Sequence, residues 1–177
     1  MEITLNQIRL HISRADITQL EVDGVVNAAN NRLLGGAGVD GAIHRAAGPA
    51  LLDECKTLNG CKTGEAKITA GHKLPASYII HTVGPVWHGG QQNEAELLAS
   101  SYRNSLQLAK DYHLNSIAFP ALSCGVYGYP VDKAANIAIN EIKRFSNKPG
   151  SIKDVVLVAF SGEMLDVLET AARAINA

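Results

Sequence analysis

Amide side chains and small residues are concentrated in one stretch, "NAANNRLLGGAGVDGAIHRAAG", which covers residues 27–48. Three asparagines follow an apolar run, four small residues come next, and a helix-like segment then begins with Asp40 near its start. Glycine lets the backbone approach a ligand closely because it has no side chain to intervene. The stretch therefore predicts a polar ligand that lies against the backbone at one corner of the molecule.

A second glycine-rich stretch, "ALSCGVYGYP" at residues 121–130, also follows an apolar run and precedes a helix-like segment. Backbone N–H groups in both stretches lack an obvious strand partner, and the first N–H groups of each following helix point outward. Such groups bind phosphate oxygens, and a helix dipole adds about 0.3–1 kcal/mol per anion. Two stretches of this kind facing one another predict a site for a pyrophosphate.

Other phosphate-binding and nucleophile motifs fit the sequence poorly. Gly36, Gly38 and Gly41 satisfy GxGxxG, but a Rossmann fingerprint also needs a second strand that ends in an acidic residue about 20 residues later. The sequence has no such strand there and no Gly-Lys-Ser/Thr of a Walker loop. Cys124 lacks the nearby arginine of a phosphatase loop, so we interpret it as a small packed side chain rather than a nucleophile.

The elements that must position these stretches alternate between short β-rich runs and longer helical runs. The predicted strands are Ile3–Leu5, Ile8–Ile12, Gly24–Ala28, Ala66–Ala70, Tyr78–Thr82, Ser116–Pro120 and Asp154–Phe160. The predicted helices are Val39–Ala47, Pro49–Leu58, Asn93–Tyr112, Asp132–Phe145 and Glu163–Ile175.

Runs such as "VVNAA" and "DVVLVAF" are apolar on both faces, as in strands that helices cover on both sides. The predicted fold class is therefore α/β, a single three-layer α/β/α sandwich over residues 1–177. Its central sheet is mostly parallel, with an antiparallel N-terminal edge. Ligands bind beyond the carboxyl ends of strands in such sheets, so we expect a polar crevice between residues 30–38 and 123–128.

Composition and charge narrow the functional classes. The chain of 177 residues, 46% hydrophobic and 19% charged, suits one globular domain, and its net charge of -1 gives no support for RNA binding or membrane attachment. Three cysteines without CxxC spacing and six histidines without an HxxxH pair predict no disulfide framework, no metal site and no cofactor, and favour a cytoplasmic protein. The N-terminal sequence does not read as a signal peptide.

The long motifs resemble a known family. "VVNAANNRLLGGAGVDGAIHRAAGPAL", "HTVGPVW" and "FPALSCGVYGYP", with "ADIT" near the start, are similar to the macrodomain family, and more closely to its MacroD-like branch. The similarity runs from about Arg14 to Pro130. It implies an ADP-ribose-binding α/β/α fold. For this branch it also implies hydrolysis of O-acetyl-ADP-ribose and of mono-ADP-ribose esterified to Asp or Glu side chains of proteins.

Residue by residue, the resemblance implies that Asp16 accepts a hydrogen bond from the adenine amino group, with Ile17 beside it. It implies that Asn30 holds the distal ribose and that Asp40, near that ribose, orients or deprotonates a water molecule. Tyr127 corresponds to an aromatic residue that packs on the same ribose. From the residues alone, Asp16 equally fits a helix cap, Asp40 an acidic residue in a first helical turn, and Tyr127 core packing.

The site implied by the resemblance has two catalytic candidates, Asn30 and Asp40. Its ligand-binding residues are Asp16, Ile17, Gly36, Ala37, Gly38, Val39, Ser123, Cys124, Gly125, Val126 and Tyr127. We expect Asn27 and Tyr129 to support the loops, and we assign His44 and Arg45 structural roles. Trp87 and His88 are left outside the site, at its rim.

The sequence departs from the family pattern at Ala15, where glycine is usual, and at Ala37, in a run that is usually four glycines. The methyl group of Ala37 matters if that residue needs a positive φ or lies against the ligand. The alternative to an enzyme is a reader module that binds ADP-ribose without hydrolysing it, because a fold by itself does not decide function.

Overall fold

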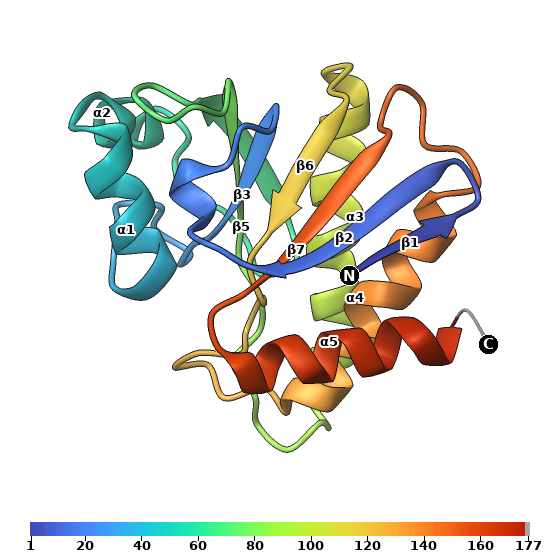
Figure 1. Ribbon diagram of the computed structural model, residues 1–177. Helices are drawn as coiled ribbons and strands as arrows, with labels where there is room; N and C mark the ends of the chain where they lie inside the picture. The colour runs from blue at the N-terminus through green and yellow to red at the C-terminus, as the bar shows by residue number, and fades with distance from the viewer. Residues whose placement is uncertain (176–177) are drawn as a thin grey trace.

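The computed structural model describes residues 1–175 and, within them, seven strands and five α-helices (Figure 1). The strands are β1 (Glu2–Leu5), β2 (Ile8–Arg14), β3 (Gly24–Ala28), β4 (Ala66–Ala70), β5 (Tyr78–Thr82), β6 (Ser116–Phe119) and β7 (Asp154–Ala159). The helices are α1 (Gly38–Ala47), α2 (Ala50–Lys56), α3 (Glu94–Asp111), α4 (Val131–Phe145) and α5 (Gly162–Ile175), and a short 3-10 helix spans Ile17–Gln19.

All seven strands form one sheet in the order β1-β2-β7-β6-β3-β5-β4. The five central strands β2, β7, β6, β3 and β5 are parallel to one another, whereas β1 and β4 pair antiparallel with β2 and β5 at the two edges. The antiparallel N-terminal edge is confirmed. The second antiparallel edge, β4, was not predicted, because the alternation of a short strand does not reveal its partner or its direction.

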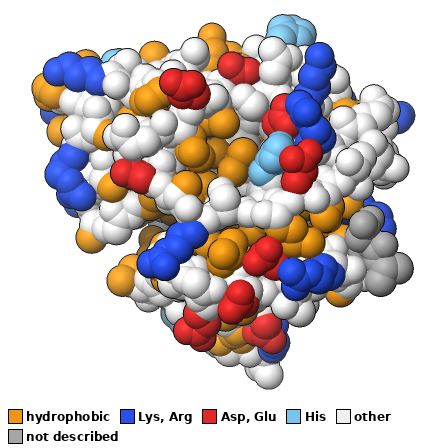
Figure 2. Space-filling view, in the orientation of Figure 1, with side chains coloured by type: hydrophobic (Ala, Val, Ile, Leu, Met, Phe, Trp, Pro, Cys, Tyr) orange, Lys and Arg blue, Asp and Glu red, His pale blue; other side chains and the backbone are white. Residues whose placement is uncertain are grey.

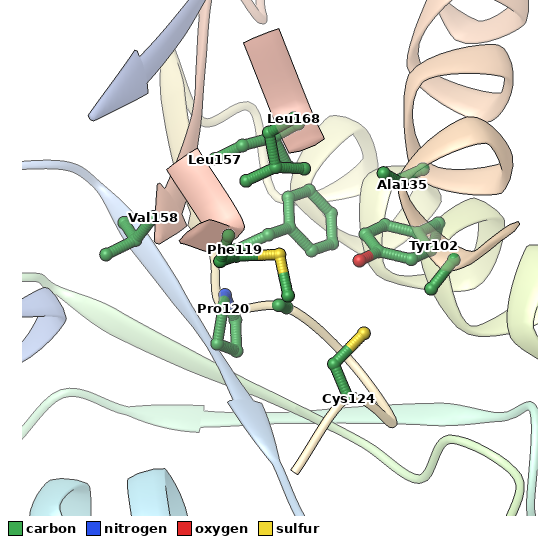
Figure 3. A pocket seen from close by; sticks show the side chains of 12 residues that line it. Tyr102, Phe119, Pro120, Cys124, Ala135, Leu157, Val158 and Leu168 are labelled. Carbon is green, nitrogen blue, oxygen red and sulfur yellow. The ribbon is translucent and has the colours of Figure 1, made fainter. Parts of the chain in front are cut away.

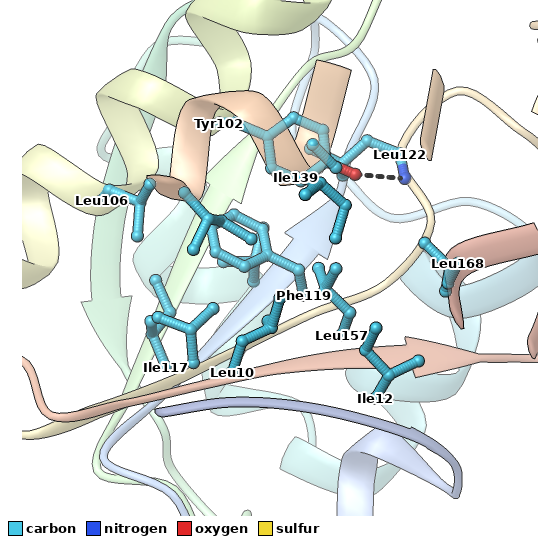
Figure 4. Close-up of a cluster of buried hydrophobic side chains, with 14 of the residues drawn as sticks. Leu10, Ile12, Tyr102, Leu106, Ile117, Phe119, Leu122, Ile139, Leu157 and Leu168 are labelled. Carbon is cyan, nitrogen blue, oxygen red and sulfur yellow. Dashed lines mark hydrogen bonds between the residues drawn. The ribbon is translucent and has the colours of Figure 1, made fainter. Parts of the chain in front are cut away.

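Helices cover both faces of the sheet (Figure 1), and alternate side chains of the strands pack against the helices of opposite faces. Val26 and Phe119 belong to the larger core under α3, α4 and α5, and Figure 4 shows part of it. Val25 and Ala118 belong to the smaller core under α1 and α2. This one-residue alternation is why the central strands are apolar on both faces, and it confirms the three-layer arrangement.

The predicted strands and helices match the structure to within two residues at each end. Two differences have a clear backbone cause. Strand β6 ends at Phe119 because Pro120 has no N–H to continue the ladder. Helix α3 begins at Glu94 because Asn93 has a left-handed backbone, with φ of 63°. Among residues 1–175, no helix has the length and apolar character that crossing a membrane requires.

Candidate functional site

The two glycine-rich loops leave the sheet from neighbouring parallel strands. Strand β3 lies beside β6, with Gly24 opposite Ile117, so both strands have their carboxyl ends at the same edge. The chain leaves β3 toward β5 and β4, but it leaves β6 in the other direction, toward β7. Such a switch point is where open α/β sheets bind ligands. The sheet topology therefore brings the two predicted loops to the same edge of the sheet, beside one another.

The first loop, residues 29–37, is fixed by its own amides. Asn30 donates from Nδ2 to the Gly35 carbonyl at 3.0 Å, and its Oδ1 accepts from the Arg32 N–H at 3.2 Å. Gly35 has a φ of 88°, which glycine adopts without strain. Asn30 thus braces the loop, a role that the sequence prediction gave to Asn27.

The N-terminus of α1 carries exposed backbone N–H groups. Its N-cap residue, Ala37, makes no side-chain capping hydrogen bond, so the first N–H groups of the helix remain available to an anion. Ala37 has a φ of -99° and is exposed. The backbone there does not need glycine, so the alanine in the "GGAG" run introduces no strain.

Asp40, in the first turn of α1, is buried at 4% exposure. Its Oδ1 accepts a hydrogen bond from Asn27 Nδ2 at 2.8 Å and lies 3.4 Å from His44 Nε2. A methyl group built on Gly36 would lie 3.0 Å from Asp40 Oδ2 and 3.3 Å from Asn30 Nδ2. Asp40 Oδ2 and the Asn30 amide therefore both lie beside the backbone of Gly36. The other carboxylate oxygen, Oδ1, is already fixed by its hydrogen bond from Asn27.

Asn27 and His81 extend this polar contact into the core. Asn27 Nδ2 also lies 3.1 Å from His81 Nδ1, and His81 Nε2 lies 2.9 Å from Thr69 Oγ1. Burial, with the nearby charge of His44, lowers the pKa of His81 to about 3. His81 is therefore neutral, and a line of buried polar groups runs from Asp40 through Asn27 and His81 to Thr69.

The second loop, residues 120–130, turns back sharply on itself. Ser123 has a φ of 65°, Tyr129 donates from its N–H to the Ser123 carbonyl at 2.9 Å, and Gly128 donates to the Gly125 carbonyl at 3.0 Å. Within residues 1–175, the N–H groups of Gly125, Val126 and Tyr127 have no backbone acceptor. These three N–H groups form a second candidate anion site, as the sequence predicted.

The loop after β5 braces the second loop. Trp87 donates from its N–H to the Tyr127 carbonyl at 2.9 Å, and its ring packs on Tyr129 with centroids 4.7 Å apart. Tyr129 is 3% exposed, so its predicted bracing role is confirmed. A side chain at Gly84 would overlap Ser123 Oγ, so glycine at this position lets the two loops approach without displacing the Ser123 hydroxyl.

Glu94 in turn orders the loop that contains Trp87. Its carboxylate accepts hydrogen bonds from the backbone N–H groups of His88, Gly90 and Gln92, at 2.8, 2.9 and 2.6 Å. Burial alone would raise the pKa of Glu94, but these hydrogen bonds outweigh burial and lower it from 4.5 to about 2. Glu94 is therefore an ionised clamp, and it indirectly supports the second glycine-rich loop.

Asp16 follows β2 at the same edge of the sheet. Its Oδ1 accepts from the Thr18 N–H at 3.0 Å and from Thr18 Oγ1 at 2.7 Å, which makes it the N-cap of the 3-10 helix. The capping interpretation is thus correct, but both bonds use Oδ1, so capping does not occupy Oδ2. Asp16 is exposed, whereas Ile17 is buried at 5% exposure and belongs to the smaller core.

Two further residues at this edge were missed by sequence reasoning. Phe160 follows β7, between the strands that lead to Asp16 and to the second loop, and its side chain is 63% exposed. An exposed aromatic ring can stack on a flat ligand group. The sequence prediction included Phe160 as the last residue of the apolar strand Asp154–Phe160, whereas β7 ends at Ala159 and leaves the ring beyond the strand. His81, within the "HTVGP" motif, was the other omission.

Cys124 lies over a small cavity beneath the second loop, which Figure 3 shows with Phe119, Pro120 and Leu168 in its wall. The cavity measures about 10 Å³, room for about one water molecule. Burial raises the pKa of the Cys124 thiol to about 11, so the thiol is protonated at neutral pH. Both observations support the interpretation of Cys124 as a packed side chain rather than a nucleophile.

The crevice between the two loops remains a prediction. Figure 2 shows that the surface is hollowed at the left of the view, between the part that holds α1 in Figure 1 and the part below it. An open groove of about 420 Å³ lies on the outer side of the first loop and is lined by Asn31, Arg32, Leu34, Cys55, Lys56, Asn59 and Gly60. Residues 1–175 contain no group of three His, Cys, Asp or Glu side chains that could hold a metal ion.

Comparisons with known proteins agree with this fold and identify the family. The sequence profile of the Macro domain matches residues 26–138. A "Macro domain-containing protein" of Methanosarcina mazei is 62% identical over 91% of this chain and 85% of its own length. An "O-acetyl-ADP-ribose deacetylase" of Salmonella newport is 55% identical over 88% of this chain and 89% of its own.

A solved structure of an Oceanobacillus iheyensis macrodomain mutant with ADPR has a TM-score of 0.95 and 43% identity, and the match covers 99% of this chain and 98% of that one. The match in sequence and the match in fold both extend over the β3 and β6 loops described above. The chain belongs to the Macro domain family.

Proposed function

We propose that residues 1–177 act as a single cytoplasmic macrodomain that binds ADP-ribose and hydrolyses its acyl esters. The substrates are O-acetyl-ADP-ribose and mono-ADP-ribose esterified to Asp or Glu side chains of proteins. The observation that carries the proposal is the arrangement of Asp40, whose Oδ1 is held by Asn27 while Oδ2 lies beside Gly36 and the Asn30 amide. The name of the Salmonella relative supports deacetylation of O-acetyl-ADP-ribose, and the neighbour with ADPR supports binding of ADP-ribose.

The exposed backbone N–H groups of the two loops hold the pyrophosphate in this proposal. One set belongs to the first turn of α1, and the other to Gly125, Val126 and Tyr127. Backbone N–H groups suit a diphosphate because they are fixed donors that point at its oxygens, and the dipole of α1 favours negative charge at its N-terminus. Asp16 Oδ2 accepts from the adenine amino group, and Phe160 stacks on the adenine ring from the adjacent strand end.

The reaction takes place at the distal ribose, next to Asp40. Asn30 and Tyr127 orient the ribose, and Asp40 positions a water molecule and takes its proton as the water oxygen attacks the ester carbonyl carbon. The bond between that carbon and the ribose oxygen breaks. The acid leaves with the water oxygen, and the ribose oxygen takes the proton that Asp40 accepted from the water, which restores the Asp40 carboxylate. A phosphate oxygen of the substrate is an alternative acceptor for the water proton.

The test is turnover of O-acetyl-ADP-ribose by the purified protein, with and without a chelator, beside calorimetric titration with ADP-ribose. A second arm uses a protein modified on glutamate, with hydroxylamine treatment as the benchmark for complete ester cleavage. We expect micromolar or tighter ADP-ribose binding and hydrolysis of both esters. Binding without hydrolysis would make the protein a reader, and absence of binding would refute the whole proposal.

A further inference from the structure

We propose that His81 is a positioning residue for Asp40: it accepts a hydrogen bond from Asn27 and so fixes the amide that orients the Asp40 carboxylate. This inference rests on the proposed hydrolase function. His81 lies on β5, in register with Asn27 of the neighbouring strand β3, and 1% of its surface is exposed. A substrate in the crevice meets Asp40 and not His81, so His81 acts only through Asn27.

The orientation of the Asn27 amide follows from its two neighbours. A carboxylate can only accept, so the side of Asn27 that faces Asp40 Oδ1 at 2.8 Å must be the NH₂ group. The same NH₂ group faces His81 Nδ1 at 3.1 Å, so Nδ1 must be the acceptor and the ring proton must be on Nε2. Both hydrogens of the Asn27 amide are then used.

The contacts of Nε2, on the other side of the His81 ring, stabilise this tautomer. His81 Nε2–H points to Thr69 Oγ1 at 2.9 Å, and the Thr69 hydroxyl donates onward to the Ala70 carbonyl at 3.2 Å. Cys55 Sγ is a second, weaker neighbour of Nε2 at 3.9 Å. Asn27 therefore donates on both sides: directly to the Asp40 carboxylate, and through His81 and Thr69 to the backbone of β4.

The arrangement carries a cost that argues for a functional role. Asn27 is fully buried and its Oδ1 has no hydrogen-bond partner among residues 1–175. A buried polar atom without a partner is unfavourable, and loss of His81 would leave an Asn27 N–H unpartnered as well. The amide would then be held by Asp40 Oδ1 alone, so the orientation of the Asp40 carboxylate beside Gly36 would be less fixed.

The experiment compares His81→Leu with His81→Asn. Leucine and asparagine have nearly the same shape, but only asparagine offers an oxygen at the position of Nδ1. We expect His81→Leu to lower single-turnover hydrolysis of O-acetyl-ADP-ribose about 10- to 100-fold relative to His81→Asn, as loss of an orienting partner does at other sites. ADP-ribose affinity by calorimetry should differ between the two by less than about threefold, because the contact acts on Asp40 alone.

A measurement on the unaltered protein tests the tautomer directly. In an NMR spectrum of ¹⁵N-labelled protein, we expect the His81 ring to carry its proton on Nε2 and to show no titration between about pH 5 and 8. A proton on Nδ1, titration in that range, or equal hydrolysis rates for the two variants overturns the role of His81. Absence of turnover by the wild-type protein instead overturns the proposed function, and the catalytic role of His81 with it.

Discussion

Replacing Asp40 by asparagine removes the charge of the candidate base and keeps its shape. Asn27 Nδ2 donates to Asp40 Oδ1 at 2.8 Å, and an asparagine at this position still presents an oxygen to that donor. We expect hydrolysis of O-acetyl-ADP-ribose to fall about 10²–10⁴-fold, the usual range for a positioned acid or base. That loss corresponds to about 3–5 kcal/mol of transition-state stabilisation.

The same Asp40→Asn substitution should have little effect on the affinity for ADP-ribose, or should increase it. Removing a carboxylate near the pyrophosphate relieves repulsion between like charges, so we expect affinity to stay within about tenfold of wild type or to rise. The two measurements are calorimetric affinity for ADP-ribose and single-turnover hydrolysis on the same preparation. A combined loss of binding and turnover would indicate a damaged site rather than a missing base.

Asp40→Ala provides the structural control. It removes the acceptor of a fully buried Asn27 donor, which costs about 1–3 kcal/mol, whereas Asp40→Asn keeps an acceptor there. We therefore expect the alanine variant to melt at a lower temperature than the asparagine variant, with similarly slow turnover in both. Near wild-type hydrolysis by Asp40→Asn would remove Asp40 from the mechanism and assign the water proton to a substrate phosphate.

Three further changes test other parts of the site. Asp16→Ala should weaken ADP-ribose binding by about 0.5–3 kcal/mol in calorimetry, and Asp16→Asn controls for the lost helix cap. Gly36→Ala should reduce hydrolysis at least about tenfold, because its methyl group would lie 3.0 Å from Asp40 Oδ2; unchanged turnover would show that the loop can yield. Glu94→Gln should lower the melting temperature at pH 7. Because folding lowers the pKa of Glu94 from 4.5 to about 2, its contribution is present above pH 4.5 and lost as the pH falls toward 2, where the two proteins should melt alike.

The fold could be predicted because its signals are local. Val25 and Val26 face opposite cores, and an apolar run of this kind reports burial on both faces from sequence alone. The direction of β4 could not be predicted, because it depends on pairing with β5, and short strands give no local sign of their partner. The loops were found because glycine and asparagine are unusual directly after buried strands.

The support behind the site was harder to predict because it joins residues far apart in the sequence. Asn27 and Asp40 are 13 residues apart, and Asn27 and His81 are 54 apart. No spacing rule connects such pairs until the strands are placed side by side. For Asn30, the family resemblance predicted a role in binding the ligand. Its hydrogen bonds within the first loop were not predicted and became visible only in the structure.

The side chain of Val126, 98% exposed at the second loop, offers a place to attach a reporter. The proposed site uses the Val126 backbone, so its side chain can be exchanged without removing a ligand contact. The native thiols would compete poorly with Val126→Cys for a dye at neutral pH. Burial raises the pKa of Cys55 and of Cys124 to about 11 and also raises that of Cys61, whereas an exposed cysteine ionises near pH 8.5. A fluorophore on that single reactive thiol would convert occupancy of the crevice into an optical signal, so that binding could be followed in real time without labelling the nucleotide.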